Sequence, residues 1–431
     1  MAAIEYKCPN CGASLKFDAK SQKVVCEFCG SEFEPEVLKK YDQELSEKKE
    51  EKLDWEDSTK EFSKAEAASL NLYTCNSCGG EIYCDENTSA TTCPYCGNPV
   101  ILKGRLQGAL KPDYVIPFKN TNDDLVPIMQ KYLRRKLFLP GKFKTENKIK
   151  EIKGLYVPFW IHDADVEGSV RWKGYTEKTW TNGDTRYTER KHYCIIREGR
   201  LGFDHIPVDG SKKMPDQLME SIEPFDFKGA IKFEPSYLTG YLSDKYDVTK
   251  EEVFPRANQR IREGTIDQFG TTISSSYRGL QVQNTNLSLY NTHVDYALYP
   301  VWLMSTQYKD KNFLFAMNGQ TGKMTGNLPM AKLKAFLLTM IFLLVPTAIG
   351  LILSIVGQES FNPMCLAIGG IVGAIAAIVF FTINYKALKP VTFQRGARNY
   401  YRQGSMNLSR REDIFLYKTV TRTRIASSSK K

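Results

Sequence analysis

Two apolar stretches in the C-terminal part of the chain decide its organisation: AFLLTMIFLLVPTAIGLILSIV at residues 335–356 and MCLAIGGIVGAIAAIVFFTI at residues 364–383. Neither contains a charged residue, and each has the roughly 20 residues that a helix needs to cross about 30 Å of hydrocarbon. Because backbone groups within lipid must satisfy their own hydrogen bonds, we predict two transmembrane helices joined by a tight turn. Buried helices of a soluble domain are the alternative interpretation.

The charges around the two stretches predict the orientation of this hairpin. Lys332 and Lys334 precede the first stretch, Lys386 and Lys389 follow the second, and the connecting turn holds a single charge, Glu359. Basic residues concentrate on the cytoplasmic side of membrane proteins. We therefore expect both chain ends in the cytoplasm and the turn outside.

Small residues recur at four-residue steps in the second stretch, at Gly369, Gly373 and Ala377. Such a face allows another helix to approach closely. The sequence leaves two partners open for it: the first stretch of the same chain, or a second copy of the protein in a homo-oligomer.

The net charge of +10 is concentrated after the hairpin. Residues 386–431 contain 12 Lys and Arg against two acidic residues, so the rest of the chain is neutral. Basic residues in this position interact with anionic headgroups, which makes membrane lipid an expected partner. A solvated tail whose charge only enforces topology is an equal alternative, and nucleic-acid binding is a third.

Eight of the 11 cysteines form four Cys-x-x-Cys pairs, and the same gap of 14 residues separates the two pairs of each set. Four thiolates suit tetrahedral zinc, and a two-residue spacer lets both sulfurs of a pair reach one ion. In a cytoplasmic setting this spacing favours metal over disulfides. We predict two zinc ribbons, each with one structural zinc ion, whose ligands are Cys8, Cys11, Cys26 and Cys29 in the first and Cys75, Cys78, Cys93 and Cys96 in the second.

Other roles for these cysteines fit less well. A redox pair would need a strand-to-helix context, and catalytic zinc needs an open site with three protein ligands. Iron in place of zinc stays open for the second site. Cys84 lies inside the second ribbon but outside the motif, and we interpret it as a free thiol.

The region between the second ribbon and the hairpin predicts a mixed α+β body. Asn122 is the expected N-cap of a helix, residues 249–269 predict another, and Asn182-Gly183-Asp184 indicates a turn within a β-meander. Two similar runs at 154–161 and 297–304 suggest two related β units. The first helix is basic on one face, which is either solvated or a surface for lipid or nucleic acid, with Lys131, Arg134, Arg135 and Lys136 as its residues.

Catalytic motifs are missing from the sequence. There is no His-Glu-x-x-His and no Gly-x-Ser-x-Gly elbow, and the run Gly319 to Lys323 lacks the spacing and the Ser or Thr of a P-loop. The segments at residues 162–165 and 204–205 hold His and Asp that would form a site only if the fold joined them. We expect no enzyme activity.

Several motifs together resemble the bacterial membrane proteins described as transcription-factor-IIB-type zinc-ribbon proteins. Members are often labelled from their ribbons alone as a primosomal helicase or an RNA polymerase subunit, but no helicase motor motif is present here. The resemblance implies a zinc-containing protein of the bacterial cell membrane without established enzyme activity, whose relatives are thought to anchor flotillin-like or phage-shock-like envelope-stress partners. It rests on residues 93–99, 114–118, 154–160 and 315–323 and on the ribbon cysteines.

The sequence thus predicts a multidomain protein with two small zinc ribbons, an α+β, largely antiparallel β cytoplasmic body, and a two-helix transmembrane hairpin. We expect a membrane-anchored adaptor or scaffold for cytoplasmic proteins; a membrane-tethered nucleic-acid- or RNA-polymerase-binding protein is the alternative. The expected units are a ribbon at 1–33, a charged linker at 34–72, a ribbon at 73–104, the body at 105–330, transmembrane helices at 335–356 and 364–383, and a basic cytoplasmic tail at 384–431.

Overall fold

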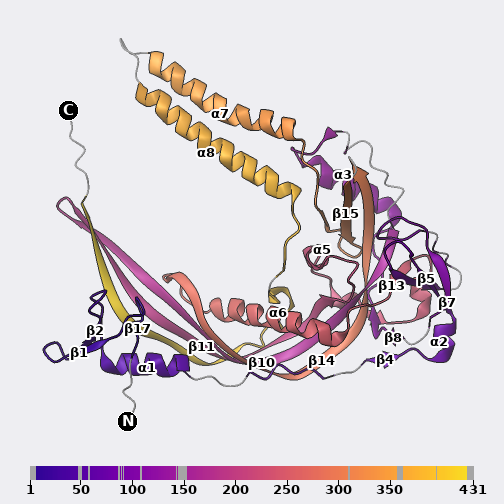
Figure 1. Ribbon diagram of the computed structural model, residues 1–431, viewed down its shortest axis with the longest axis horizontal. Helices are drawn as coiled ribbons and strands as arrows, with labels where there is room; N and C mark the ends of the chain where they lie inside the picture. Colours follow the sequence, from indigo (N-terminus) through magenta and orange to yellow (C-terminus); the bar gives the residue numbers. More distant parts are fainter. Residues whose placement is uncertain are drawn as a thin grey trace.

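The computed structural model of the chain describes residues 6–46, 51–56, 59–85, 88, 90, 92–106, 109–141, 143, 153–308, 311–356, 363–394 and 396–424. It has the predicted multidomain architecture: two knots of four cysteines, a body rich in antiparallel sheet, and two apolar helices. Figure 1 shows a long curved sheet with the helical hairpin rising from one end. The predicted turn around Glu359 lies outside the described residues.

Four long strands form the curved sheet. β11 (Thr185–Asp209) and β14 (Arg278–Tyr308) flank β10 (Lys153–Asn182), and β17 (Asn407–Arg424) adds to the outer edge of β11, all antiparallel. The predicted turn joins β10 to β11, because Asn182 pairs with Thr185 and Gly183 takes a φ of 59°. The shorter strands of the body are β8 (Leu110–Lys111), β9 (Tyr114–Val115), β12 (Ile231–Lys232), β13 (Leu242–Asp244), β15 (Lys311–Asn318) and β16 (Met324–Gly326).

The two similar runs at 154–161 and 297–304 are neighbouring strands of one sheet rather than separate units. Tyr156 lies opposite Pro300, and Pro158 lies opposite Leu298. Their side chains build the centre of the body, where the rings of Phe159 and Tyr299 stack at 4.7 Å. Apolar strands of this kind are expected where both faces of a sheet are covered.

One long helix, α6 (Lys250–Gly270), lies along the sheet (Figure 1), close to the expected range 249–269. Thr249 caps it in a capping box with Glu252. On its buried side, Arg260 pairs with Glu223 at 2.6 Å. The Tyr400 hydroxyl donates to the same carboxylate at 2.7 Å, so the segment after the hairpin is held against the body.

Helix α3 (Asn122–Arg134) begins one residue earlier than expected. Thr121 is its N-cap, not Asn122. Asp124 explains the difference, because its carboxylate accepts hydrogen bonds from both the backbone N–H and the hydroxyl of Thr121, at 2.8 and 2.9 Å. An acidic residue three positions after a Thr favours that Thr as the cap.

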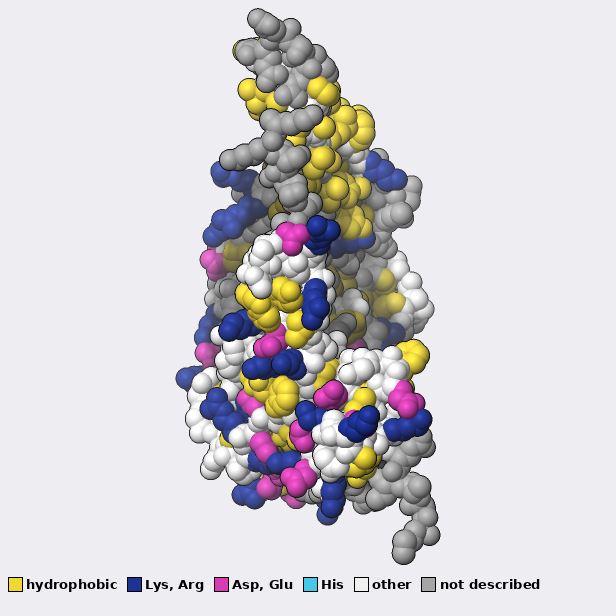
Figure 2. Space-filling view, turned by 90° about the vertical axis from the view of Figure 1, so that its left-hand side faces the viewer, with side chains coloured by type: hydrophobic (Ala, Val, Ile, Leu, Met, Phe, Trp, Pro, Cys, Tyr) yellow, Lys and Arg dark blue, Asp and Glu magenta, His cyan; other side chains and the backbone are white. Residues whose placement is uncertain are grey.

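The hairpin consists of α7 (Lys332–Ile355) and α8 (Pro363–Leu388), both long and apolar enough to cross a membrane. Its small-residue face packs against the first helix of the same chain. A Cβ on Gly369 would meet the Pro346 carbonyl oxygen at 2.7 Å, and one on Gly373 would meet the Leu343 oxygen at 2.5 Å. Within this chain, the small-residue face therefore packs against α7. Figure 2 shows apolar side chains gathered over the hairpin, with basic and acidic ones interspersed below.

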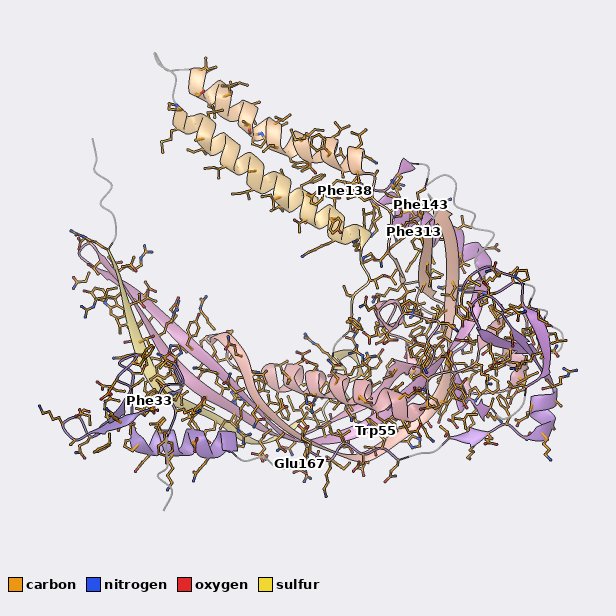
Figure 3. The ribbon with its side chains drawn as sticks, in the orientation of Figure 1. Phe33, Trp55, Phe138, Phe143, Glu167 and Phe313 are labelled. Carbon is orange, nitrogen blue, oxygen red and sulfur yellow. The ribbon has the colours of Figure 1, made fainter. Side chains whose placement is uncertain are left out.

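The charged linker is more than a spacer. It contains α1 (Pro35–Ser46), which lies against β17, and Trp55, whose indole N–H donates to Asn258 at 2.9 Å (Figure 3). Although the segment is rich in charge, its Glu44 is buried against Arg171 and Arg410. The linker also holds β4 (Lys60–Glu61) and α2 (Lys64–Ala68).

The basic tail is likewise not a loose segment. Residues 407–424 form β17, and Ile414, Leu416 and Tyr417 are buried. Alternating polar residues occupy the other face of this edge strand, which explains why its composition reads as a solvated tail. Five of the 12 basic residues that the sequence assigns to the headgroup region, and both of the acidic ones, therefore lie on a sheet edge.

Candidate metal centres

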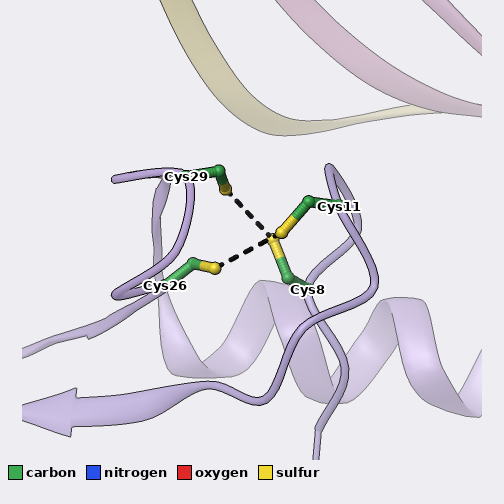
Figure 4. A group of neighbouring side chains, drawn as sticks. All are labelled: Cys8, Cys11, Cys26 and Cys29. Atoms are coloured by element: carbon green, nitrogen blue, oxygen red, sulfur yellow. Dashed lines mark hydrogen bonds between the residues drawn. The ribbon is translucent and has the colours of Figure 1, made fainter.

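The first group of four cysteines lies in a small sheet of β1 (Lys16–Asp18), β2 (Lys23–Val25) and β3 (Glu32–Phe33). Figure 4 shows the four sulfurs converging on one point, with Cys8 and Cys11 on one loop and Cys26 and Cys29 on another. The Cys8 and Cys29 sulfurs lie 3.6 Å apart, and those of Cys11 and Cys26 lie 3.5 Å apart.

The second group repeats this geometry between β5 (Leu70–Thr74), β6 (Glu81–Asp85) and β7 (Ile101–Arg105). The sulfurs of Cys75 and Cys96, and those of Cys78 and Cys93, lie 3.6 Å apart. All four ligand atoms lie within 4.8 Å of one another. The structure therefore brings together all eight cysteines that the sequence assigns to metal.

The donor sets fit zinc. Four sulfurs at about 2.3 Å from a tetrahedral ion stand roughly 3.8 Å apart, close to the observed separations of 3.5 to 3.6 Å. Both groups could hold zinc, and in each the ion would link two loops through four thiolates. With four protein ligands, a tetrahedral ion has no position left for substrate.

A glycine follows each Cys-x-x-Cys pair for a geometric reason. Gly12, Gly30, Gly79 and Gly97 all have φ between 69° and 77°, which side chains rarely tolerate. The N–H of each glycine donates to the carbonyl of the first cysteine of its pair, at 2.8 to 3.0 Å. The turns that aim the paired sulfurs are thus encoded locally.

The two centres are attached to the body in different ways. Strand β6 of the second pairs with β13 of the main sheet, and the Lys213 amine donates to the Cys78 carbonyl at 2.6 Å. In the described part of the chain, no strand of the first pairs with the main sheet. Instead, Phe33 packs on Tyr417 with ring centroids 5.5 Å apart (Phe33 is labelled in Figure 3), the Tyr417 hydroxyl donates to Asn10 at 3.1 Å, and the Lys173 amine donates to the Pro9 carbonyl.

The sequence did not indicate the surface of the body against which the first centre packs, which we call its seat. Its apolar residues come from α1 and from β17, which are more than 360 positions apart. A usable signal was the short apolar run at residues 414–417, which is consistent with a buried strand segment. The surrounding excess of charge obscured it.

The first centre exposes two aromatic side chains. Phe28, between the cysteines of the second pair, is 83% exposed, and Phe17 on β1 is 57% exposed. At the position equivalent to Phe28, the second centre has Tyr95, which packs against the apolar clusters of the body. Only the first centre thus offers an uncovered aromatic on its metal knuckle.

The remaining cysteines lie apart from the two groups. Cys84 is a buried free thiol on β6, and burial raises its pKa to about 11. Cys194 is buried in β11, and Cys365 lies on α8.

The basic residues of α3 do not approach either cysteine group. Lys131, Arg134 and Arg135 are exposed, whereas Lys136 is half-buried and its amine donates to the Ala387 carbonyl at 2.7 Å. This contact places them at the foot of the hairpin.

The fold partly joins the scattered His and Asp residues. Asp163 lies 3.3 Å from the ring of His205, and Arg402 pairs with both Asp165 and Asp204. His162 is not part of this group, because it is buried with its ring against Trp55. Within the described ranges, no three of these residues bring ligand atoms as close together as the cysteines do.

Ionisation of the Asp163–His205 pair follows from its contacts. Burial alone would lower the pKa of His205, but the Asp163 carboxylate outweighs this and raises it. Burial likewise tends to raise the pKa of Asp163, but its hydrogen bonds from His205 lower it. The contacts between the two groups thus favour the charged form of each.

Comparison with known proteins gives one informative match. The chain is 36% identical over 329 residues to the Uncharacterized protein YdjG of Bacillus subtilis, a match covering 76% of this chain and 91% of that protein. No family profile matches, and no solved structure matches.

Proposed function

This chain belongs to the family of YdjG, and we propose that it is a membrane-anchored adaptor of the bacterial cell membrane, in which two structural zinc ions stabilise a body that presents the first metal centre to a cytoplasmic protein. The observation that carries the proposal is the exposure of Phe28 on a metal knuckle whose own ligands are complete. Aromatic residues, Phe included, are enriched in protein–protein interfaces relative to the rest of the surface.

Membrane anchoring by both ends of the hairpin is part of the proposal. Strand β17, which follows the hairpin, pairs with β11, which precedes it. Both flanks of the hairpin therefore lie on the same side of it, as two membrane crossings require. The basic flanks support the cytoplasmic side for the body and both termini.

Protein binding fits the first metal centre, which we call the head, better than nucleic-acid binding does. The described part of the first ribbon has Lys16 paired with Glu27 at 2.9 Å and Lys23 near Glu32 at 3.5 Å, so much of its positive charge is locally compensated. The exposed basic helix α3 lies at the hairpin instead. Flotillin-like and phage-shock-like membrane proteins are the partner classes that the resemblance makes the first to test.

Photocrosslinking from position 28 tests the proposal. A crosslinking amino acid replaces Phe28 in the full chain in bacterial membranes, and the matched control replaces Ile101, which is 55% exposed on the second ribbon. We expect a discrete protein adduct from position 28, resistant to nuclease, and absent from position 101 and from a Cys8→Ser/Cys11→Ser background.

Three results would contradict the adaptor. Equal crosslinking from both positions would show random contact, and an adduct that survives Cys8→Ser/Cys11→Ser would show that the metal centre does not present the surface. An adduct removed by nuclease would favour the nucleic-acid-binding alternative.

A further inference from the structure

Three distant segments of the chain meet at the foot of the hairpin. The Ala331 N–H, just before α7, donates to the Phe138 carbonyl at 2.8 Å, and the Leu328 N–H donates to the Leu388 carbonyl at 2.9 Å. With the Lys136 contact to Ala387, these hydrogen bonds connect the end of α3 to the start of α7 and the end of α8.

Aromatic packing fixes the same junction. The Phe138 ring is buried and lies 5.7 Å, between ring centroids, from both Phe380 and Phe381 on α8. Beside it, Phe143 packs edge-on against Phe313; Figure 3 labels Phe138, Phe143 and Phe313. Because closely packed aromatic rings hold a defined geometry, α3 keeps a fixed position relative to the hairpin.

This junction gathers exposed positive charge without acidic residues. The segments 130–139, 330–336 and 384–391 contain eight Lys or Arg and no Asp or Glu. Of these eight, Lys136 is half-buried, and burial lowers the pKa of its amine. This amine donates to the Ala387 carbonyl and is thus part of the junction. The other seven are exposed and form what we call the basic collar: Lys131, Arg134, Arg135, Lys332, Lys334, Lys386 and Lys389.

The collar continues directly into apolar surface. Leu333, between two collar lysines, is 73% exposed, and Phe336 one turn later is 60% exposed. Tyrosines occupy the boundary: the Lys136 amine lies 4.5 Å from the Tyr132 ring centre, and the Lys389 amine lies 5.0 Å from that of Tyr385. Tyr and Lys at the end of an apolar span are typical of the headgroup region of a bilayer.

We propose that the basic collar binds the phosphate groups of anionic phospholipids in the leaflet from which the hairpin rises. Clustered Lys and Arg beside a membrane span attract anionic headgroups, and Arg presents several N–H donors in a geometry matched to phosphate. Arg134 and Arg135 come from the body rather than from the spans, so bound lipid would join the body to the bilayer. The proposal goes beyond the adaptor function and requires only that the hairpin sits in lipid.

Lipid titration of the detergent-solubilised full chain, followed by native mass spectrometry, tests this inference. The probes are phosphatidylglycerol and phosphatidylcholine with the same acyl chains, and a 30-base single-stranded DNA. The collar variant is Lys131→Gln/Arg134→Gln/Arg135→Gln. The control removes three lysines that are exposed elsewhere, Lys20→Gln/Lys228→Gln/Lys232→Gln. Zinc content and thermal unfolding verify that both variants fold.

We expect tighter binding of phosphatidylglycerol than of phosphatidylcholine, weakened at least tenfold by the collar variant and unchanged by the control. Equal binding of both lipids, or equal losses in both variants, would overturn the proposal. DNA binding that the collar variant abolishes while phosphatidylglycerol binding persists would assign the collar to nucleic acid. None of these readouts depends on the protein partner, so the collar and the adaptor can fail separately.

Discussion

The two cysteine centres have nearly the same internal geometry but opposite relations to the rest of the molecule. The second is continuous with the main sheet through the pairing of β6 with β13, and its knuckle aromatic, Tyr95, packs inward. The described strands of the first pair only with one another, not with the main sheet, and its knuckle aromatic, Phe28, faces solvent. One motif therefore supplies a structural part of the body in one copy and a projecting head in the other.

Loss of metal should produce the largest difference between the two centres in their effect on the stability of the body. The free energy of binding structural zinc, about 10–16 kcal/mol in zinc-finger peptides, is comparable to the stability of a whole domain, about 5–15 kcal/mol. Because β6 is part of the main sheet, Cys75→Ser/Cys78→Ser should unfold a large part of the body, whereas Cys8→Ser/Cys11→Ser should leave it folded. Zinc per chain and thermal unfolding of the purified protein measure this. Equal thermal losses would abolish the distinction.

The seat of the first centre depends on a buried ion pair. The Glu44 and Arg171 side chains are only 11% and 4% exposed and lie 2.8 Å apart. Glu44→Ala should cost about 3–5 kcal/mol, because it leaves a buried guanidinium without its carboxylate. Denaturant unfolding and hydrogen exchange of α1 report the change. The double variant Glu44→Leu/Arg171→Met should lose much less, and an equal loss would show that packing rather than charge holds the seat.

The knuckle aromatics should differ in their contribution to stability. Tyr95→Ala removes a ring that packs against the body and should cost about 2 kcal/mol or more. Phe28→Ala removes a ring that is 83% exposed and should change stability by no more than about 0.5 kcal/mol. Equilibrium unfolding of both variants makes the comparison. A large loss for Phe28→Ala would mean that the head is not a free surface.

The two attachments should respond to pH with opposite signs. Burial raises the pKa of Asp244, beside the second centre, from 3.8 to about 7, against the hydrogen bond from Ser211. A folded-state pKa above the unfolded value means that stability is lost as pH rises from about 4 to about 7. Asp244→Asn should remove that loss.

Glu44, beside the first centre, titrates the other way. Burial tends to raise its pKa, but Arg410 and Arg171 outweigh burial and lower it below the ordinary value of 4.5. Its contribution is therefore complete above that value and is lost as pH falls through the folded-state pKa. Hydrogen exchange at pH 5 and pH 8 should show β13 more protected at the lower pH and α1 unchanged. Parallel behaviour of the two segments would contradict this assignment.

The predictable parts of the molecule are those encoded by local chemistry. The cysteine spacing and the glycine after each pair determine the knuckles within five residues, and the length of an apolar run is imposed by the thickness of a bilayer. The turn at Asn182 and the helix after Thr249 are local signals of the same kind. In the cap of α3, Asp124 decides between Thr121 and Asn122, which composition alone does not resolve.

The parts that could not be predicted depend on partners distant in sequence. Glu44 meets Arg410 across 366 positions, so the linker and the tail both appear as solvated charge until the fold joins them. The same holds for Lys136 and Ala387 at the collar. Which aromatic would be exposed on a knuckle also depended on the neighbouring body rather than on the motif.

The late position of β17 in the chain imposes an order of assembly. The edge of β11 that receives β17 is synthesised about 200 residues before its partner, with both hairpin helices in between. An unpaired strand edge is prone to wrong pairing. The edge of β11 stays without its β17 partner until both hairpin helices have been synthesised. Tyr417 and Ile414, which complete the seat of the first centre, arrive with that last strand. The surface against which the first centre packs is therefore complete only in chains synthesised through both helices of the hairpin.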